Sequence, residues 1–274
     1  MNPIRTCLFL ACLGASLARA EQLPLWEMGL GIGVIHFPHY RGSNQYENWV
    51  FPAPYVVYRG DFLKAEERTL RGQFFKSERV ELDLSIYGSP PAKDNEARRG
   101  MPDLDWTVEI GPALNFALYR SEDTKWKLEL RLPVRGVVAS DFHHLNGLGW
   151  IFQPNLALDV RDVLGERGWK FGLFSSRIYA NRGYNQYFYA VDPEFATPER
   201  PAFSIGGGYG GTQFIASLSK RFPQFWLGGF VKWDSVASAV FTDSPLVKTK
   251  YNLSSGLAVA WILGESTAKV EAAN

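Results

Sequence analysis

Residues 104–119 read LDWTVEIGPALNFALY, and this stretch decides the fold. Its even positions carry large apolar side chains, such as Trp106 and Val108, whereas its odd positions carry polar or small ones, such as Thr107 and Glu109. A β-strand places successive side chains on opposite faces, so this alternation predicts a strand with one apolar and one polar face. The stretch is also much longer than the usual soluble strand of about 5–6 residues.

The alternation continues on both sides of this stretch, and no segment has a helical period. The chain is therefore predicted to be all-β. We expect eleven segments, at 26–35, 49–59, 62–75, 79–87, 104–119, 125–138, 149–161, 169–179, 203–220, 225–234 and 250–263. An odd number of crossings cannot leave both termini on one side of a membrane. Either the charged segment 62–75 does not cross, which gives ten strands, or one strand is missed, which gives twelve. We predict twelve.

An alternating all-β chain can form a soluble barrel or a transmembrane barrel, and the two differ in which face is inside. In a transmembrane barrel the apolar face contacts lipid and the polar face lines the lumen. A tilted strand of about 10 residues crosses a bilayer, and the best segments exceed that length. Tryptophans cluster at segment ends, as in interfacial girdles: Trp26, Trp49, Trp106, Trp126, Trp150, Trp169, Trp226 and Trp261. We predict an antiparallel up-and-down transmembrane β-barrel, with a soluble periplasmic barrel as the alternative.

The lengths of the connections support a barrel with two different ends. Short links at 120–124, 162–168 and 222–224 alternate with long ones at 36–48, 88–103, 139–149, 180–202 and 235–250. Short periplasmic turns and long extracellular loops are typical of outer-membrane barrels.

The first twenty residues have the pattern of a secretory signal peptide. A positive residue precedes an apolar run, and small residues lead to a cleavage site between Ala20 and Glu21. We therefore divide the chain into a signal peptide (1–20) and a barrel domain (21–274) with a polar tail (264–274), located in a Gram-negative outer membrane. A lipoprotein with Cys12 as the lipidated residue is the alternative. Cys7 and Cys12 both lie in this leader, so the predicted mature chain has no cysteine.

Composition excludes several classes of protein. The 274 residues carry 29 basic and 28 acidic side chains, a formal net charge of +1, whereas a general nucleic-acid binder needs a basic surplus. No run of 18 apolar residues occurs, which excludes a helical membrane protein. We expect outer-membrane lipid as a partner and no nucleic acid.

The predicted inner face carries charges of both signs. Long side chains of opposite charge inside a barrel of this size are expected to form a hydrogen-bonded network that fills the lumen. This network would favour a structural role over a wide pore. Its predicted members are Glu109, Lys127, Glu129, Arg131, Arg135, Asp159 and Arg161.

A tyrosine-rich segment in the longest connection is the best candidate for a binding site. Aromatic side chains in a loop can anchor a partner or a glycan. Alternatively, the loop folds back and caps the barrel, which buries the same rings. The candidate contact residues are Tyr184, Asn185, Gln186, Tyr187 and Tyr189.

The histidines form two pairs with no strong metal-binding spacing, so we predict no metal and no cofactor. The pairs are His36 with His39, and His143 with His144. The run 140–143 contains Ser, Asp and His, but close sequence neighbours rarely reach the geometry of a catalytic triad. We predict no catalytic residues and no enzyme, and a loop-borne hydrolase is the alternative.

Three loop phrases carry a resemblance to a known family. They are YRGS at 40–43, the tyrosine-rich phrase at 184–189 followed by DPE at 192–194, and SPLV at 244–247. With the leader and the strand pattern, the chain resembles the MipA/OmpV family of Gram-negative outer-membrane proteins. The resemblance implies a scaffold that links a lytic transglycosylase to a penicillin-binding protein in peptidoglycan assembly. A porin-like channel and a surface adhesin are the alternatives, and no catalytic residues come with the family.

Overall fold

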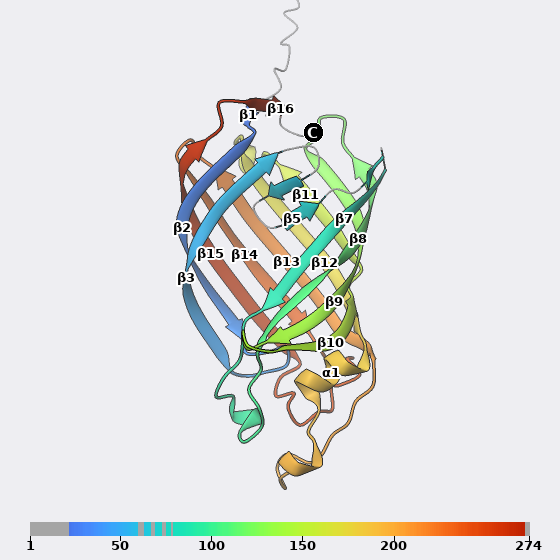
Figure 1. The fold of residues 1–274 in the computed structure, drawn as a ribbon. Helices are drawn as coiled ribbons and strands as arrows, with labels where there is room; N and C mark the ends of the chain where they lie inside the picture. Colours follow the sequence, from blue (N-terminus) through green and yellow to red (C-terminus); the bar gives the residue numbers. More distant parts are fainter. Residues whose placement is uncertain (1–21, 60–62, 67–68, 73–74, 78, 272–274) are drawn as a thin grey trace, which may run out of the picture.

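The computed structural model describes residues 22–59, 63–66, 69–72, 75–77 and 79–271. Its main strands form one antiparallel barrel (Figure 1). They are β2 (Trp26–Pro38), β3 (Tyr46–Arg59), β7 (Val80–Ser89), β8 (Trp106–Arg120), β9 (Trp126–Ser140), β10 (Leu145–Phe152), β11 (Asn155–Arg161), β12 (Trp169–Ala180), β13 (Gly208–Arg221), β14 (Phe225–Ser235) and β15 (Tyr251–Glu265). Most of these strands pair with their neighbours in sequence, and β15 pairs with β2. The predicted up-and-down barrel is confirmed. In the described part of the chain, no helix is long and apolar enough to cross a membrane.

The number of strands differs in detail from the prediction. The predicted strand 149–161 is divided into β10 and β11, which both pair with β9 and β12. The break falls at Gln153 and Pro154, and a proline has no N–H to donate to a ladder. The described residues contain ten crossings. Between β3 and β7 lie the short strands β4 (Leu63–Glu66), β5 (Thr69–Gly72) and β6 (Phe75–Lys76). Part of that segment lies outside the described residues, so twelve strands stays a prediction.

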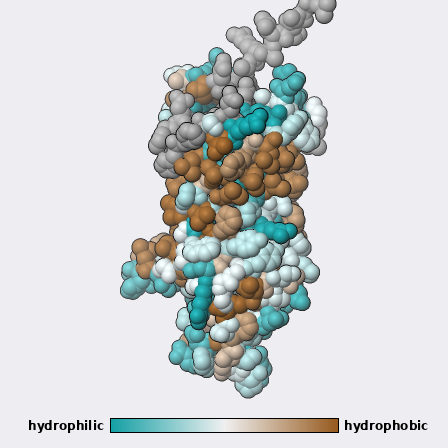
Figure 2. Space-filling view, turned by 90° about the vertical axis from the view of Figure 1, so that its right-hand side faces the viewer, coloured by the Kyte–Doolittle hydropathy of each residue, from teal (hydrophilic) through white to brown (hydrophobic). Residues whose placement is uncertain are grey.

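The apolar faces of the strands point outward. On β8, the side chains of Trp106, Val108 and Ile110 are exposed, whereas Thr107 and Glu109 are each only 3 % exposed. Figure 2 shows the outward residues as a hydrophobic band across one face of the barrel, below its upper rim. A soluble barrel would hide these side chains, so the exposed band identifies the outer wall as a lipid-facing surface.

Tryptophans border this band on two levels. Trp126 begins β9. Trp150 on β10 lies opposite Gly136, which is ten residues after Trp126 along β9. Ten residues of strand extend roughly 33 Å, and a tilt near 40° reduces the vertical distance to roughly 25 Å. That distance matches the apolar band of an outer-membrane barrel. Trp169 begins β12 at the same end as Trp126, as a girdle at that level requires. The predicted girdle position of Trp226 is wrong, because Trp226, the second residue of β14, packs inward against Tyr55 and Ala260.

The two ends of the barrel have different structures. At the terminal end, β1 (Gln22–Pro24) pairs with β16 (Lys269–Glu271), and β15 continues to Glu265. Much of the predicted polar tail (264–274) is therefore strand. The loop end carries α1 (Arg182–Tyr189) and the short 3-10 helices η1 (Glu96–Arg98) and η3 (Pro193–Phe195), whereas η2 (Val163–Gly165) follows β11. The predicted signal peptide, with its cleavage site between Ala20 and Glu21, lies outside the described residues.

One predicted long loop is wrong. The connection 139–149 was expected to be a loop, but β9 continues to Ser140 and β10 begins at Leu145. Ladder pairing extends through the glycine-rich segment because Gly149 adopts a φ of +113° at a register shift between Gly147 and Gly149. Glycine takes this conformation at little cost, so a bulge forms where a loop was expected.

Candidate functional site

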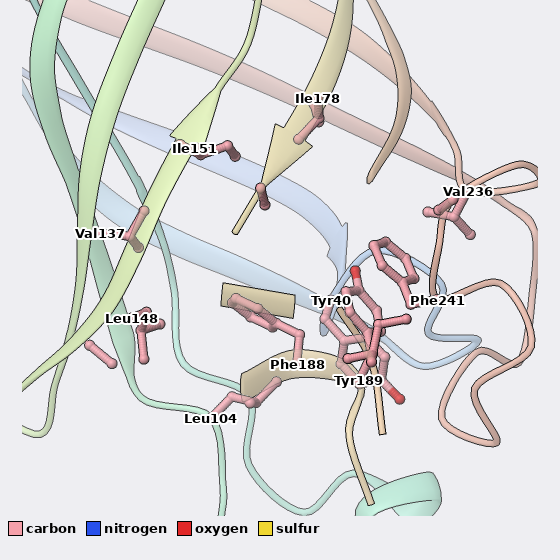
Figure 3. Close-up of a cluster of buried hydrophobic side chains, with 14 of the residues drawn as sticks. Tyr40, Leu104, Val137, Leu148, Ile151, Ile178, Phe188, Tyr189, Val236 and Phe241 are labelled. Atoms are coloured by element: carbon pink, nitrogen blue, oxygen red, sulfur yellow. The ribbon is translucent and has the colours of Figure 1, made fainter. Parts of the chain in front are cut away.

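The loop end of the barrel is closed by a hydrophobic core, which we call the plug. It is built from four connections and not from the strands alone (Figure 3). The ring of Tyr189 stacks on Phe241 at 3.5 Å between centroids, and Tyr40 meets Tyr189 edge-on at 6.2 Å. The main buried members are Tyr40, Ala92, Leu104, Phe188, Tyr189, Ile205, Val236, Ala239 and Phe241.

Helix α1 lies at the centre of the plug. Asn181 caps it by accepting a hydrogen bond from the backbone N–H of Tyr184 at 3.3 Å, as preferred N-cap residues do. The same Asn181 oxygen accepts from the N–H of Trp150 on β10 at 3.2 Å. The cap therefore also fastens the helix to the barrel wall.

The five residues that the sequence singled out as loop contacts all lie in α1. Asn185 is fully buried and donates to the carbonyl of Gly206 at 2.9 Å. The Tyr187 hydroxyl accepts from the N–H of Asp105 at 2.7 Å, and the Tyr189 hydroxyl donates to the Arg41 carbonyl at 2.9 Å. Tyr184 and Gln186 are half-buried. These side chains hold the plug together, as the folding-back interpretation of this loop describes.

Burial also changes the acid–base chemistry of the plug. It raises the pKa of the Tyr40 phenol to about 12 and raises the pKa of Tyr184 well above its ordinary value. It lowers the pKa of the Arg98 guanidinium, which is 7 % exposed and donates to the carbonyls of Phe188 and Pro102. The tyrosines therefore act as neutral hydrogen-bond donors and acceptors. None of them is prepared to act as a base near neutral pH.

Beneath the plug, a chain of polar side chains runs around the inner wall. Arg135 donates to the Glu109 carboxylate at 2.8 Å and to the Gln153 amide oxygen at 2.5 Å. Gln153 donates to Gln213 at 3.2 Å, and Gln213 donates to Asp234 at 3.0 Å. The chain links β8, β9, β13 and β14, so neighbouring strands are held together by side chains as well as by their ladders.

Asp234 joins this chain to the plug. The Arg41 guanidinium, from the connection after β2, donates to Asp234 at 3.1 Å and to the Gly210 carbonyl at 2.6 Å. Lys232 lies 3.4 Å from the other Asp234 oxygen. Sequence reasoning did not assign Arg41, Gln213 or Asp234 to the network. Lys232 and Asp234 are two residues apart on β14, so their side chains lie on the same face. This spacing could have predicted that both face inward.

Six of the seven predicted inner-wall charges belong to two separate groups. Glu109 and Arg135 belong to the chain beneath the plug. Nearer the terminal end, Glu129 forms an ion pair with Lys127 at 2.5 Å and accepts a hydrogen bond from Arg131 at 2.7 Å, and Arg131 reaches Asp159 at 3.4 Å. Arg161 is exposed at the end of β11.

A third ionic group, which the sequence analysis missed, lies at the terminal end. Glu27 is fully buried, forms an ion pair with Arg59 at 2.8 Å, and accepts hydrogen bonds from Arg221 at 2.8 Å and from the Tyr55 hydroxyl at 3.2 Å. Arg221 also reaches Glu265 at 3.3 Å. Glu27 lies between Trp26 and Met28, which face outward. Because side chains alternate along a strand, this position could have predicted that Glu27 faces inward.

A cavity of about 620 Å³ lies under α1. Its lining is mostly apolar and aromatic, and comes from β2, β3, β7, β8 and the plug. The volume falls within the roughly 300–1,000 Å³ range of small-molecule sites. Phe37, Trp49, Phe51, Tyr87 and Phe188 are among its walls.

The histidines have separate partners within the described residues. His36 bonds Asn48 at 2.8 Å, and His39 bonds Asn95 at 3.0 Å. His143 and His144 surround Asp141, whose pKa is lowered by hydrogen bonds from their backbone N–H groups. No group of three or more metal-ligating side chains is found in the described ranges.

Comparison with known proteins identifies one family. The family model described as MltA-interacting protein MipA matches residues 30–263. A BTB/POZ domain-containing protein of Arabidopsis thaliana is 26% identical over 183 residues, which cover 65% of this chain and 36% of that protein, so the match spans about a third of its length.

Three solved structures resemble the barrel. An outer-membrane channel of Pseudomonas putida F1 has a TM-score of 0.47 and 11% identity, over 90% of this chain and 98% of that one. The toluene transporter TbuX of Ralstonia pickettii has a TM-score of 0.29 and 10% identity, over 90% and 71%. The outer-membrane protein OprG of Pseudomonas aeruginosa has a TM-score of 0.22 and 12% identity, over 86% and 94%.

Proposed function

This chain belongs to the MltA-interacting protein MipA family, and we propose that it is an outer-membrane scaffold for murein-processing enzymes. In this proposal a lytic transglycosylase binds at the periplasmic side of the barrel, where a penicillin-binding protein joins it. The family description names the first partner. The proposed second partner follows from the resemblance of the loop phrases.

The plug is the observation that favours a scaffold over an open channel. An aqueous pore needs a continuous polar path, and the loop end is instead filled by stacked rings such as Tyr189 and Phe241. Below it, the inner wall is bridged by paired charges such as Arg135 and Glu109. A barrel whose interior is occupied in this way is a rigid platform.

The terminal end offers the platform's exposed surface. The turn between β8 and β9 presents Glu122 and Asp123, and the connection before β12 presents Glu166 and Arg167, all exposed. Charged groups of both signs in short turns can orient an enzyme and raise its association rate. We place the partner there because short turns and both described chain ends share this side.

Capture by the purified transglycosylase tests the proposal. The full-length protein in lipid nanodiscs is titrated against the immobilised enzyme, with a double variant E122K/D123K at the terminal end. Asp141→Lys is the matched control, because Asp141 is an exposed acid in the β9–β10 turn. We expect about tenfold weaker capture for the double variant and no change for Asp141→Lys, since about 1.4 kcal/mol corresponds to a factor of ten. Equal capture by every variant, or none by the parent protein, would refute the proposed site.

A porin-like channel is the alternative, and the cavity under α1 is the observation that favours it. Conductance in planar bilayers separates the two functions. The scaffold predicts no steady conductance for the parent protein. A channel predicts steady conductance that changes when Glu129 or Arg131, on the inner wall, is replaced.

A further inference from the structure

The wall of the barrel is joined differently at one place, which we call the seam. β3 pairs with β2 along its length, but on its other edge the described pairs are limited to Tyr58 and Arg59 with β4. The corresponding edge of β7 has described pairs at Leu82 and Glu81 with β6. In the described residues, the loop-end halves of β3 and β7 therefore have no ladder between them.

Aromatic side chains close the seam. The ring of Trp49 on β3 lies 5.4 Å from the ring of Trp106 on β8, and Phe37 meets Trp49 edge-on at 5.4 Å. Side-chain contacts of this kind are weaker than a backbone ladder, and half-exposed side chains change rotamer rapidly. Among the described residues, no backbone hydrogen bond joins the two sides of the seam, so its loop-end half can open by a change of side-chain contacts alone.

The cavity under α1 reaches the seam from inside. Its walls include Phe51 and Tyr87, which belong to the inward faces of their strands yet are 38 % and 46 % exposed. They also include Trp106 and Val108, whose side chains belong to the lipid-facing side of β8. The cavity thus connects the lumen with the apolar outer surface.

The chemistry of the cavity suits an apolar occupant. Most of its walls are aromatic or aliphatic, and most of its charged and amide side chains already have partners within the protein. Gln153 and Gln213 bond each other, Glu109 is paired with Arg135, and Lys232 with Asp234. A charged solute would find no unpaired opposite charge among these three pairs, whereas burial of apolar surface against the aromatic walls is favourable.

We propose that this cavity binds a small hydrophobic molecule that enters sideways from the bilayer through the seam. Tyr184, Phe188 and Tyr189 cover the cavity toward the loop end, so the route runs through the seam between β3 and β7. The occupant is either an acyl chain of a bilayer lipid or a free hydrophobic compound, since both share the required chemistry.

Photolabelling of the full-length protein in nanodiscs tests the proposal. One arm uses a phosphatidylcholine with a diazirine in its acyl chain, and the other adds a free diazirine fatty acid. We expect crosslinks at inward residues, namely Phe51, Tyr87 and Tyr184, in at least one arm. Labelling from the phospholipid alone assigns a lipid chain, and labelling from the fatty acid assigns a free compound. Crosslinks confined to outward residues such as Val231 in both arms would overturn the proposal.

Filling the cavity provides a second test. Ser89→Trp places a large ring at a half-buried position of the lining. It should reduce labelling of Tyr184 about tenfold, which corresponds to a loss of about 1.4 kcal/mol in binding free energy. Val231→Trp adds the same ring on the lipid-facing side of β14 and should leave that labelling unchanged. Heat-modifiable mobility checks folding, and Ile35→Phe replaces Ser89→Trp if that variant does not fold. Unchanged labelling in a folded, filled variant would contradict binding in the cavity.

Discussion

The two ends of the barrel interior are stabilised by opposite chemistry. At the terminal end, Glu27 is held by Arg59 and Arg221, and the centre of that region is ionic. At the loop end, Tyr189 and Phe241 stack in a core that consists mainly of aromatic and aliphatic side chains. Strand alternation explains the difference, because a membrane barrel uses its apolar positions on the outside. A hydrophobic core inside such a barrel has to come mainly from the loops.

The largest effect is expected when the loop-end core is opened. Phe241 is 1 % exposed, and Phe241→Ala removes its ring from the stack on Tyr189. Replacing a buried Phe by Ala costs about 3–5 kcal/mol. Hydrogen exchange of the α1 amides should show opening that is easier by that amount, while the strand amides stay protected. Val240→Ala is the control, because Val240 is 43 % exposed. Equal effects from both variants would mean that the plug is not a packed core.

The ionic end should respond to loss of its central charge. Glu27→Ala leaves Arg59 and Arg221 close together without their shared carboxylate. Breaking a buried ion pair from one side costs about 3 kcal/mol. Urea unfolding in lipid vesicles, followed by tryptophan fluorescence, measures the loss. Glu265→Gln is the matched variant, since its side chain is 52 % exposed and it contacts only the edge of the cluster. Its cost should stay under about 1 kcal/mol. A smaller loss for Glu27→Ala than for Glu265→Gln would show that the cluster is not organised around Glu27.

The link between the plug and the wall can be tested at its cap. Asn181→Ala removes the oxygen that accepts from both Tyr184 and Trp150. Loss of an N-cap costs about 1 kcal/mol, and we expect slightly more because two N–H groups lose a partner. Protease accessibility of α1 should rise about tenfold, since a factor of ten corresponds to about 1.4 kcal/mol. Resistance equal to that of the parent protein would assign the anchoring of α1 to its packing alone.

The smallest effect is expected from one hydroxyl of the plug. Tyr189→Phe keeps the ring on Phe241 but removes the donor to the Arg41 carbonyl. A single neutral hydrogen bond contributes about 1 kcal/mol. The α1 hydrogen-exchange measurement should therefore show a loss well below that of Phe241→Ala. A loss as large as that of Phe241→Ala would indicate that polar contacts, and not stacking, stabilise the loop end.

Local pattern was sufficient for the wall of the barrel. The residues 104–119 alternate so strongly that the strand, its direction of facing and the inward position of Glu109 could all be predicted. The partners of Glu109 could be predicted only in part, because Arg135 lies on the neighbouring strand and its pairing depends on register. Register is shifted at several bulges, such as that between Ala117 and Tyr119, which leave no clear signature in the sequence.

The plug could not be predicted at the same level. An eight-residue helix is too short to show a helical period, so Tyr184 to Tyr189 read as a loop with two alternatives. Arg41 and Asp234 are 193 positions apart, and no local rule brings them together. The seam is likewise visible only when the edges of β3 and β7 are seen in one wall.

Long strands with one apolar and one polar face could be predicted from the sequence alone, because a period of two is a local property of the backbone. The lengths of the strands favoured lipid on the apolar side. The contents of the barrel became visible only in the folded chain: the closed plug, the three ionic groups and the cavity behind the seam that Trp49 and Trp106 close. These features depend on contacts between connections far apart in the chain, and such contacts are set by the closure of the whole wall.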